Sequence, residues 1–368
     1  MLRTLKSFAQ ERVDLRFRGT SSGDALICYI ITSRINRWIS RNHHPNSMEF
    51  EAILSHLRAR AKNVTACDYR SKRIRKNLDI LFGFGPAFNA NINYARQLVY
   101  YSTGASATFQ QDAARRELDY LRGRHSWASA DEFRWPLSED IQTQQVVKNI
   151  ILVGNEWTRS TFPSGRKTLT VPGISLLAED DAPHRSLRGT DLLWLGSKGI
   201  LHKGLHIAAT VAKIVGRKLH VVGLSRAAHP LAARILRESE CVYEAYPMLD
   251  VNGRAFRDIA RRAAVALGTS VSEGMSTSIL TAASLGVHPV TTEACGIDLG
   301  FVVKGEERSR LPENLAAEVE RLLLLPDKVA TDAANDIREA VKQEHSLSAF
   351  EGRLSRALIA FLGQQVTP

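Results

Sequence analysis

The stretch VALGTSVSEGMSTSILTAASLGVHPV, residues 265–290, shows the pattern from which the fold can be predicted. It opens with an apolar segment typical of a buried strand. It continues through small hydroxyl residues and a lone carboxylate, Glu273, into a helical period and a second apolar segment. A strand, a helix and another strand in this order are typical of a parallel sheet covered by helices. Because ligands bind at the carboxyl ends of such strands, Glu273 and its neighbours are candidates for a site.

The same alternation extends along most of the chain. Apolar segments predict strands at 25–32, 63–69, 78–85, 97–104, 149–155, 191–197, 218–225, 241–247, 264–270 and 288–294. Helical periodicity predicts helices at 47–61, 109–124, 156–162, 202–215, 229–239, 256–263 and 347–363. Strands that alternate with helices over this length predict an α/β protein with parallel sheets.

A break in the alternation predicts where the domains meet. Residues 162–191 are rich in Pro, Gly and charge, and the length of 368 residues favours two domains. We expect two Rossmann-like α/β/α domains that face a central cleft. The predicted parts are a basic N-terminal segment (1–24), a first domain (25–165), a second domain (166–345) and a C-terminal helix (346–368) that packs back on the first domain.

Composition narrows the class of protein. The formal net charge of +11 favours anionic partners. No run of residues approaches the roughly 20 apolar positions that span a bilayer, so we expect the protein inside the cell. Four scattered cysteines, Cys28, Cys67, Cys241 and Cys295, predict reduced thiols and no metal site.

Eight Lys or Arg against three acids in residues 1–42 leave two interpretations open, a frayed solvated terminus or a peripheral anchor on an anionic membrane. No nucleic-acid-binding motif is present, so nucleic acid is not the expected partner.

The loop after the predicted strand at 191–197 carries features of a phosphate site. Gly196, Gly199 and Gly204 surround Lys203, and a helix follows. Small residues let a ligand approach the backbone, and the helix N-terminus favours an anion. The Walker sequence G-x-x-x-x-G-K-[ST] is absent. The alternative is a surface lysine beside a tight turn.

The loop around Glu273 suits a sugar attached to a diphosphate. The hydroxyls of Ser276, Thr277 and Ser278 and the free N–H groups of the helical turn can bind phosphates. A glutamate repels phosphates, so we expect Glu273 to face the sugar. In the alternative interpretation, Ser272 or Glu273 simply caps the helix.

The segments WLGSKGILHKG and SEGMSTSILTAASLGVHPV together resemble the donor-binding half of glycosyltransferase family 4, the retaining GT-B enzymes, most clearly over residues 190–300. The resemblance implies that Lys203 binds the donor diphosphate and that Glu273 contacts the transferred sugar. YEAYPML (243–249) lies where such enzymes often hold the nucleotide base. The donor-binding residues that follow from this resemblance are Gly196, Ser197, Tyr246, Pro247, Gly274, Met275, Ser276, Thr277, Ser278 and Thr281.

The chain departs from the family pattern at two positions. The second glutamate of the E-x7-E pattern, which usually binds the ribose, is replaced by Thr281. An arginine that often precedes the lysine is replaced by Ser197. A threonine can still bind a ribose hydroxyl, but a neutral hydrogen bond is typically weaker than a charged one. The departures are compatible with altered donor choice, weak activity or binding alone.

The first domain resembles the family less, and its candidates are predicted from position. His44, Asn46 and Glu49 precede or begin a helix, where they reach the mouth of the cleft or, alternatively, Asn46 or Ser47 caps the helix. Three further candidates on the acceptor side follow predicted strands: Thr103, Gly104 and Asn155.

These observations predict transfer of a sugar from a UDP- or GDP-linked donor to an acceptor hydroxyl, with retention, in the assembly of cell-surface polysaccharide or glycolipid. No cofactor or metal ion is expected, because no Asp-x-Asp cation site is present and protein cations can stabilise the leaving diphosphate. The acceptor is expected to be a glycan or a lipid-linked molecule, and an anionic membrane surface is a further expected partner. The alternatives are a weak or inactive GT-B module that binds nucleotide or glycan, a sugar-nucleotide epimerase, and a basic nucleic-acid-binding protein.

Overall fold

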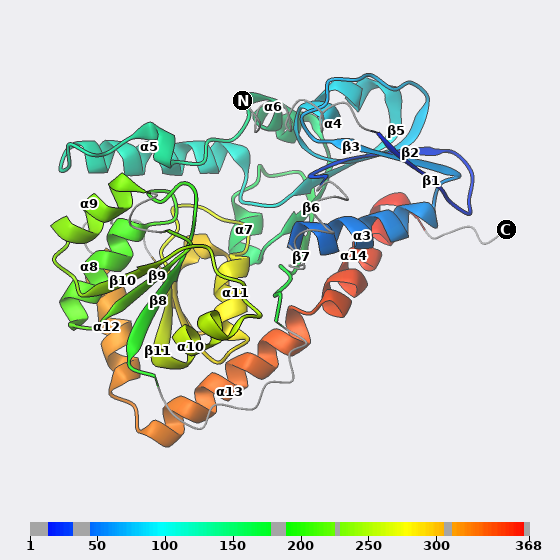
Figure 1. Cartoon of the computed structure of the whole chain (residues 1–368). Helices are drawn as coiled ribbons and strands as arrows, with labels where there is room; N and C mark the ends of the chain where they lie inside the picture. The colour runs from blue at the N-terminus through cyan, green and yellow to red at the C-terminus, as the bar shows by residue number, and fades with distance from the viewer. Residues whose placement is uncertain (1–13, 32–44, 178–188, 225–228, 305–310, 364–368) are drawn as a thin grey trace. The chain divides into compact units, whose positions relative to one another are not determined.

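The computed structural model describes residues 14–31, 45–177, 189–224, 229–304 and 311–363 (Figure 1). The chain divides into two compact units. The first comprises 1–108, 136–172 and 347–368, and the second comprises 109–135 and 173–346. This division differs from the predicted boundaries in two respects. Residues 109–135 belong to the second unit, and the main junction lies at 172/173 and not at 165/166.

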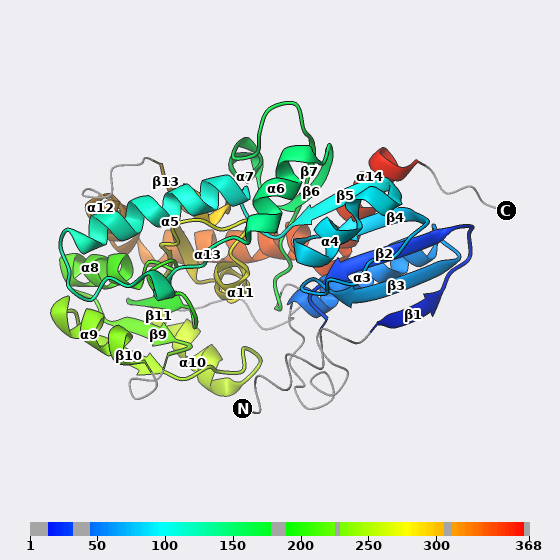
Figure 2. The ribbon, with the colours of Figure 1, turned by 90° about the horizontal axis from the view of Figure 1, so that it is seen from above.

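The first unit is built on a seven-stranded sheet in the order β1-β3-β2-β4-β5-β6-β7, parallel except that β1 runs antiparallel to β3. The strands are β1 (Leu15–Arg18), β2 (Asp24–Tyr29), β3 (Asn63–Asp68), β4 (Leu78–Gly83), β5 (Ala95–Ser102), β6 (Asn149–Val153) and β7 (Lys167–Val171). Two strands of this sheet, β1 and β7, are not predicted from the apolar pattern of the sequence (Figure 2). Both are short strands at the edges of the sheet, where only part of each strand is buried and the apolar signal is therefore weak.

The helical segments of the first unit are α3 (Pro45–Arg58), α4 (Gly85–Asn91), η1 (Ile92–Tyr94), α6 (Ser138–Val146), α7 (Glu156–Ser160) and α14 (Leu347–Leu362). Its core contains buried strand residues such as Leu26 and Leu81 together with Phe88 of α4. The helix α14 packs against β6, β7 and α3, and Lys167 of β7 donates a hydrogen bond to the carbonyl of Ala360 (2.9 Å). The C-terminal helix therefore completes the first unit.

The second unit is built on a fully parallel sheet in the order β10-β9-β8-β11-β12-β13. The strands are β8 (Asp191–Leu195), β9 (Leu219–Val222), β10 (Tyr243–Tyr246), β11 (Ala263–Gly268), β12 (His288–Thr292) and β13 (Phe301–Val303). The helical segments are α5 (Ala107–Arg122, largely in this unit), η2 (Ala130–Glu132), α8 (Leu205–Val215), α9 (Pro230–Glu238), α10 (Arg254–Arg262), α11 (Thr277–Ala283), η3 (Glu293–Cys295), α12 (Leu311–Leu323) and α13 (Asp327–Glu344).

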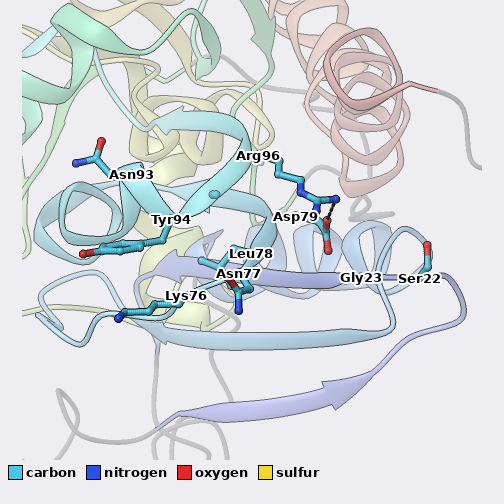
Figure 3. A pocket seen from close by; sticks show the side chains of 10 residues that line it. Ser22, Gly23, Lys76, Asn77, Leu78, Asp79, Asn93, Tyr94 and Arg96 are labelled. Atoms are coloured by element: carbon cyan, nitrogen blue, oxygen red, sulfur yellow. Dashed lines mark hydrogen bonds and ion pairs between the residues drawn. The ribbon is translucent and has the colours of Figure 1, made fainter.

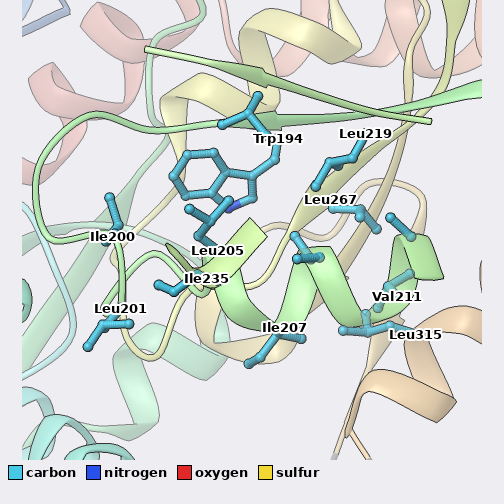
Figure 4. Packing of buried hydrophobic residues seen from close by; sticks show 14 of the residues in the cluster. Trp194, Ile200, Leu201, Leu205, Ile207, Val211, Leu219, Ile235, Leu267 and Leu315 are labelled. Carbon is cyan, nitrogen blue, oxygen red and sulfur yellow. The ribbon is translucent and has the colours of Figure 1, made fainter. Parts of the chain in front are cut away.

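The core of the second unit lies between this sheet and α8. Trp194 of β8 and Leu267 of β11 belong to the same buried cluster as Leu205 and Val211 of α8 (Figure 4). Apolar residues at helical spacing on α8 and nearly continuous apolar strands are what a parallel sheet covered by helices requires. This packing fixes the ends of β8 and β11, from which the candidate site is built.

The segment 109–135 is held to the second unit by side chains distant in sequence. Trp127 donates to Glu238 of α9 (2.6 Å), and His206 of α8 pairs with the buried Glu117 of α5 (2.9 Å). The periodicity of α5 predicts the helix but not its partner, which explains the misassigned boundary. Within the described residues, no helix is long and apolar enough to cross a bilayer.

Candidate functional site

Two loops meet at the carboxyl ends of the adjacent strands β8 and β11. The loop 196–204 follows β8 and the loop 269–276 follows β11. Gly204 has φ +69°, and a Cβ atom there would lie 1.9 Å from the carbonyl oxygen of Thr269. The hydroxyl of Thr269 donates to the carbonyls of Lys203 (3.1 Å) and Gly204 (2.8 Å). Only glycine permits this close approach, so the two loops form one rigid unit.

Lys203 and Glu273 form an ion pair at this junction. Each side chain is only 12% exposed, and the hydroxyl of Ser270 donates to Glu273 Oε1 (3.2 Å). Burial alone would raise the pKa of Glu273, but attraction to Lys203 and Arg134 and the hydrogen bond from Lys203 lower it to about 2. Glu273 is therefore ionised at neutral pH. In this state its charge neutralises the lysine that the sequence analysis assigns to the diphosphate.

Arg134 is a third charged group of the cluster, and sequence reasoning missed it. Its Nη1 atom lies 4.0 Å from Glu273 Oε1, and the side chain is 49% exposed. The preceding segment is bound to the lysine loop, because Glu132 accepts from the N–H of Ile200 through Oε2 (3.3 Å) and from the N–H of His202 through its carbonyl (3.1 Å). No motif marks Arg134, since its place depends on contacts between segments far apart in sequence. Two cations against one carboxylate leave the cluster with one excess positive charge.

Two buried polar atoms beside Glu273 have no hydrogen-bond partner among the described residues, the Nδ1 atom of His202 and the hydroxyl of Ser272. His202 is 2% exposed, and its Nε2 atom lies 2.7 Å from the carbonyl of Ser272. Burial lowers the pKa of His202 to about 4, so the ring is neutral at pH 7 and donates through Nε2. Unpaired buried polar atoms are rare in native proteins, and their presence beside the charged cluster is consistent with a polar ligand site.

The helix α11 begins differently from the capping alternative. Its N-cap is Ser276, without a side-chain capping bond, so neither Ser272 nor Glu273 caps it. The hydroxyls of Ser276 and Ser278 lie 3.1 Å apart, and Thr277 is the first helical residue.

Two predicted donor-binding residues in the same region already have partners within the protein. The sulfur of Met275 accepts from the N–H of Gly173 (3.1 Å), and the hydroxyl of Thr281 donates to the carbonyl of Thr277 (2.8 Å). Both residues are buried, as is Gly274.

The other predicted donor residues lie at the ends of β8 and β10. Gly196 follows β8, and a Cβ atom there would lie 2.5 Å from the Trp194 ring. Ser197 is half-buried beside it. Tyr246 ends β10, its hydroxyl 3.1 Å from His220 Nδ1, and the following Pro247 is exposed.

The candidates for the acceptor side belong to the first unit. Glu49 is buried and accepts hydrogen bonds from Tyr29 (2.6 Å) and Tyr101 (2.8 Å), and burial raises its pKa. Asn46 lies inside the first turn of α3, which starts at Pro45, so neither Asn46 nor Ser47 is the residue that precedes the helix.

Of the remaining acceptor candidates, His44 lies outside the described residues. Thr103 is exposed just after β5, and the carbonyl of Gly104 accepts from Ser102 (2.9 Å). Asn155 caps α7 by accepting from the N–H of Thr158 (3.0 Å). Asn155 thus has a structural role whether or not it contacts an acceptor. All four cysteines are buried and free, and the described residues contain no cluster of His, Cys, Asp or Glu suited to a metal ion.

Two parallel-sheet units, with charged loops at the strand ends of the second, define the class: the chain has the GT-B fold. Solved structures support this assignment. Sucrose-phosphate synthase from Thermosynechococcus elongatus matches with TM-score 0.57 and 14% identity over 92% of this chain and 99% of that one. Trehalose-6-phosphate synthase OtsA matches with TM-score 0.56 and 10% identity over 94% of this chain and 100% of that one.

A third match is WaaG, a glycosyltransferase involved in lipopolysaccharide biosynthesis, with TM-score 0.51 and 13% identity over 94% of this chain and 100% of that one. The chain spans 54% of the length of a further match, TarM, at TM-score 0.49. No protein-family model matches the chain, and no curated protein matches it in sequence. At these identities the likeness is one of fold.

Proposed function

We propose that this protein is a glycosyltransferase that moves a sugar from a nucleoside-diphosphate donor, UDP- or GDP-linked, to an acceptor hydroxyl. The observation that carries the proposal is the cluster of Arg134, Lys203 and Glu273 at the carboxyl ends of β8 and β11, in a fold shared with glycosyltransferases. The resemblance of residues 190–300 to glycosyltransferase family 4 supports the same function.

The charges of the cluster suit a departing diphosphate. In the ligand-free state Glu273 neutralises the charge of Lys203. Arg134 is half exposed, and its Nη1 atom lies 4.0 Å from Glu273 Oε1. Arg134 is thus the cation that an incoming diphosphate meets first. Lys203 is then shared between the phosphate and Glu273. Cations held in place before reaction stabilise the charge that develops on the leaving group.

Further details follow from the family resemblance. The reaction proceeds with retention of anomeric configuration, Glu273 contacts the transferred sugar, and the departing phosphate takes the proton of the acceptor. Arg134 takes the place of the arginine that Ser197 replaces in the family pattern. The leaving group needs no metal ion in this scheme, so donor binding should persist in EDTA.

Binding of UDP, GDP and inorganic pyrophosphate, measured by calorimetry, tests the proposal. Pyrophosphate makes the result independent of the base. We expect Lys203→Ala and Arg134→Ala each to weaken binding roughly tenfold or more, because a hydrogen bond to a charged group contributes about 1.5–3 kcal/mol. Lys198→Ala is the matched control, since Lys198 is an exposed lysine of the same loop. If none of the three ligands binds, or if Lys203→Ala binds them as wild type does, the proposed donor site is wrong.

A second candidate is a GT-B module that binds nucleotide without turnover. The burial of Thr281 favours it, because a side chain that is only 3% exposed is a poor replacement for a carboxylate that binds a ribose. Release of UDP or GDP from the donor sugars over a panel of acceptors distinguishes the two. Binding without any release supports the module.

The acceptor is proposed to be a glycan or a lipid-linked glycan of the cell surface, assembled inside the cell at the membrane. A membrane location predicts a docking surface on the protein. Salt-sensitive affinity for oligonucleotides without any response to UDP or GDP would instead support the nucleic-acid alternative.

A further inference from the structure

The loop between β3 and β4 has an unusual composition. Residues 70–76 read RSKRIRK and contain five Lys or Arg in seven positions. We call these residues the basic loop. Its aliphatic side chain, Ile74, is 56% exposed. Single exposed aliphatic side chains are ordinary on protein surfaces, and Ile74 is of interest because it lies among five cations in the sequence.

Only part of the positive charge of the basic loop is neutralised. Arg70 pairs with Asp68 (2.8 Å), and Arg73 (3.0 Å) and Arg75 share Asp14. Glu139 also attracts Lys72 without forming an ion pair, so five cations stand against three carboxylates and two are in excess. Lys72 and Lys76 are exposed and have no ion-pair partner among the described residues.

A polar hollow of about 710 Å³ adjoins the basic loop at the amino ends of β4 and β5. Figure 3 shows Lys76, Asn93 and Tyr94 at one end of the hollow and the Asp79–Arg96 pair (3.2 Å) further along it. Tyr94 is 37% exposed. The volume lies within the range of small-ligand sites, roughly 300–1,000 Å³.

These features together are complementary to the surface of an anionic lipid bilayer. Lys and Arg close to such a surface are attracted by its negative potential. Aliphatic side chains enter the boundary between headgroups and acyl chains, and tyrosine prefers this interface. A soluble phosphate or a nucleic acid would account for the lysines but not for the exposed Ile74.

We propose that the basic loop docks the first unit on an anionic phospholipid membrane. Ile74 enters the bilayer interface, Lys72 and Lys76 bind lipid phosphates, and the hollow beside Tyr94 receives a headgroup. The inference deepens the membrane part of the proposed function, but docking does not depend on the donor site of the second unit.

Co-sedimentation of the full chain with vesicles tests the proposal. The probes are vesicles of phosphatidylcholine alone and of phosphatidylcholine with one third phosphatidylglycerol. We expect binding only to the anionic vesicles and its loss at high salt. The double variant Lys72→Gln/Lys76→Gln should lower the partition coefficient roughly 25-fold, since each cation near the surface contributes about fivefold. Ile74→Ser should lower it about tenfold at constant charge.

The second unit offers a control of similar composition, because Lys213, the exposed Ile214 and Arg217 repeat the same residue types on and just after α8. Lys213 differs from the lysines of the basic loop in that it pairs with Glu240. The triple variant Lys213→Gln/Ile214→Ser/Arg217→Gln should bind vesicles as wild type does. Docking by the basic loop is overturned if the wild-type protein does not bind anionic vesicles. It is also overturned if the basic-loop variants bind them with the affinity of the wild type. It is likewise overturned if only deletion of residues 1–13 abolishes binding. Pyrophosphate binding by the same variants keeps the outcome separate from the donor site, since it should not change.

Discussion

The ion pair between Lys203 and Glu273 is the residue-scale feature on which the candidate site depends. Both groups are largely withdrawn from water, so each needs the other to offset the cost of desolvation. Ser270 and Arg134 add further stabilisation to the carboxylate. With Arg134, the cluster carries two cations against one carboxylate, which is the charge balance that the proposed diphosphate site requires.

Removal of one partner of this pair should destabilise the protein more than removal of both. Lys203→Ala leaves a largely buried carboxylate with only the Ser270 hydroxyl and the half-exposed Arg134 beside it, and should lower the free energy of unfolding by up to about 3 kcal/mol. The double variant Lys203→Ala/Glu273→Ala should recover part of that loss, as urea unfolding can show. Lys198→Ala should change stability by less than about 0.5 kcal/mol. Additive effects of the two single changes would contradict the coupling.

The buried His202 predicts a decline of stability in mild acid. Its pKa is lowered to about 4 in the folded state, whereas the unfolded chain binds a proton near pH 6.5. The unfolded state therefore gains protons first as the pH falls, and the stability present above pH 6.5 is lost progressively down to about pH 4. Between pH 7 and pH 5 the protonation of His202 in the unfolded state should lower the free energy of unfolding by about 2 kcal/mol.

The variant His202→Gln keeps a donor for the Ser272 carbonyl but does not titrate. Its urea-unfolding free energy should therefore change less than that of wild type between pH 7 and pH 5. An equal change in both proteins would exclude His202 as the source.

At the scale of elements, the joint between the lysine loop and β11 depends on Gly204. Gly204→Ala would combine a left-handed backbone with a contact of 1.9 Å to the Thr269 carbonyl, so we expect a loss well above 2 kcal/mol and weaker pyrophosphate binding. Gly216→Ala is the matched control, because Gly216 ends α8 at φ +63° with nothing within 4 Å. It should cost about 1 kcal/mol, because an alanine there must adopt the left-handed conformation, and it should leave binding intact. Equal losses in thermal unfolding would show that close contact does not matter.

Glu132, two residues before Arg134, gives a second prediction at this scale. Its charge and its hydrogen bond are expected to affect pyrophosphate binding in opposite directions. Glu132→Ala removes a negative charge near an anion site, which by itself strengthens pyrophosphate binding. It also frees the segment that carries Arg134 from the N–H of Ile200, so we expect binding several-fold weaker. Asp131→Ala, an exposed neighbour, removes the same charge without that bond and should not weaken binding. Tighter binding by Glu132→Ala would refute the positioning role.

At the scale of the whole molecule, each unit has a core of its own, and the donor is proposed to bind the second unit alone. UDP or GDP should therefore slow amide hydrogen exchange in segments 130–134, 196–204 and 269–281, which converge on the cluster. Exchange in α12 and α13, the C-terminal helices of this unit, should stay unchanged. Slowing spread evenly over the second unit would indicate general stabilisation and not this site.

Prediction from sequence succeeded where a local pattern was strong and failed where partners were remote. The parallel strands and the helix α8 follow from apolar runs and helical spacing. The edge strands β1, β7 and β13 were not predicted, because partly exposed strands of three to five residues carry little apolar signal. The segment 109–135 was assigned to the wrong unit, since an amphipathic helix does not reveal which surface its apolar face covers.

The sequence by itself determined that this is a protein of parallel sheets and helices, and that Lys203 and Glu273 each follow a strand. These properties arise from the periodicity of neighbouring residues, which decides where the backbone is buried. Only the tertiary structure decided that β8 and β11 lie side by side, that Lys203 and Glu273 therefore pair, and that Arg134 joins them. Such contacts depend on packing between segments far apart in the chain, and no local pattern records them.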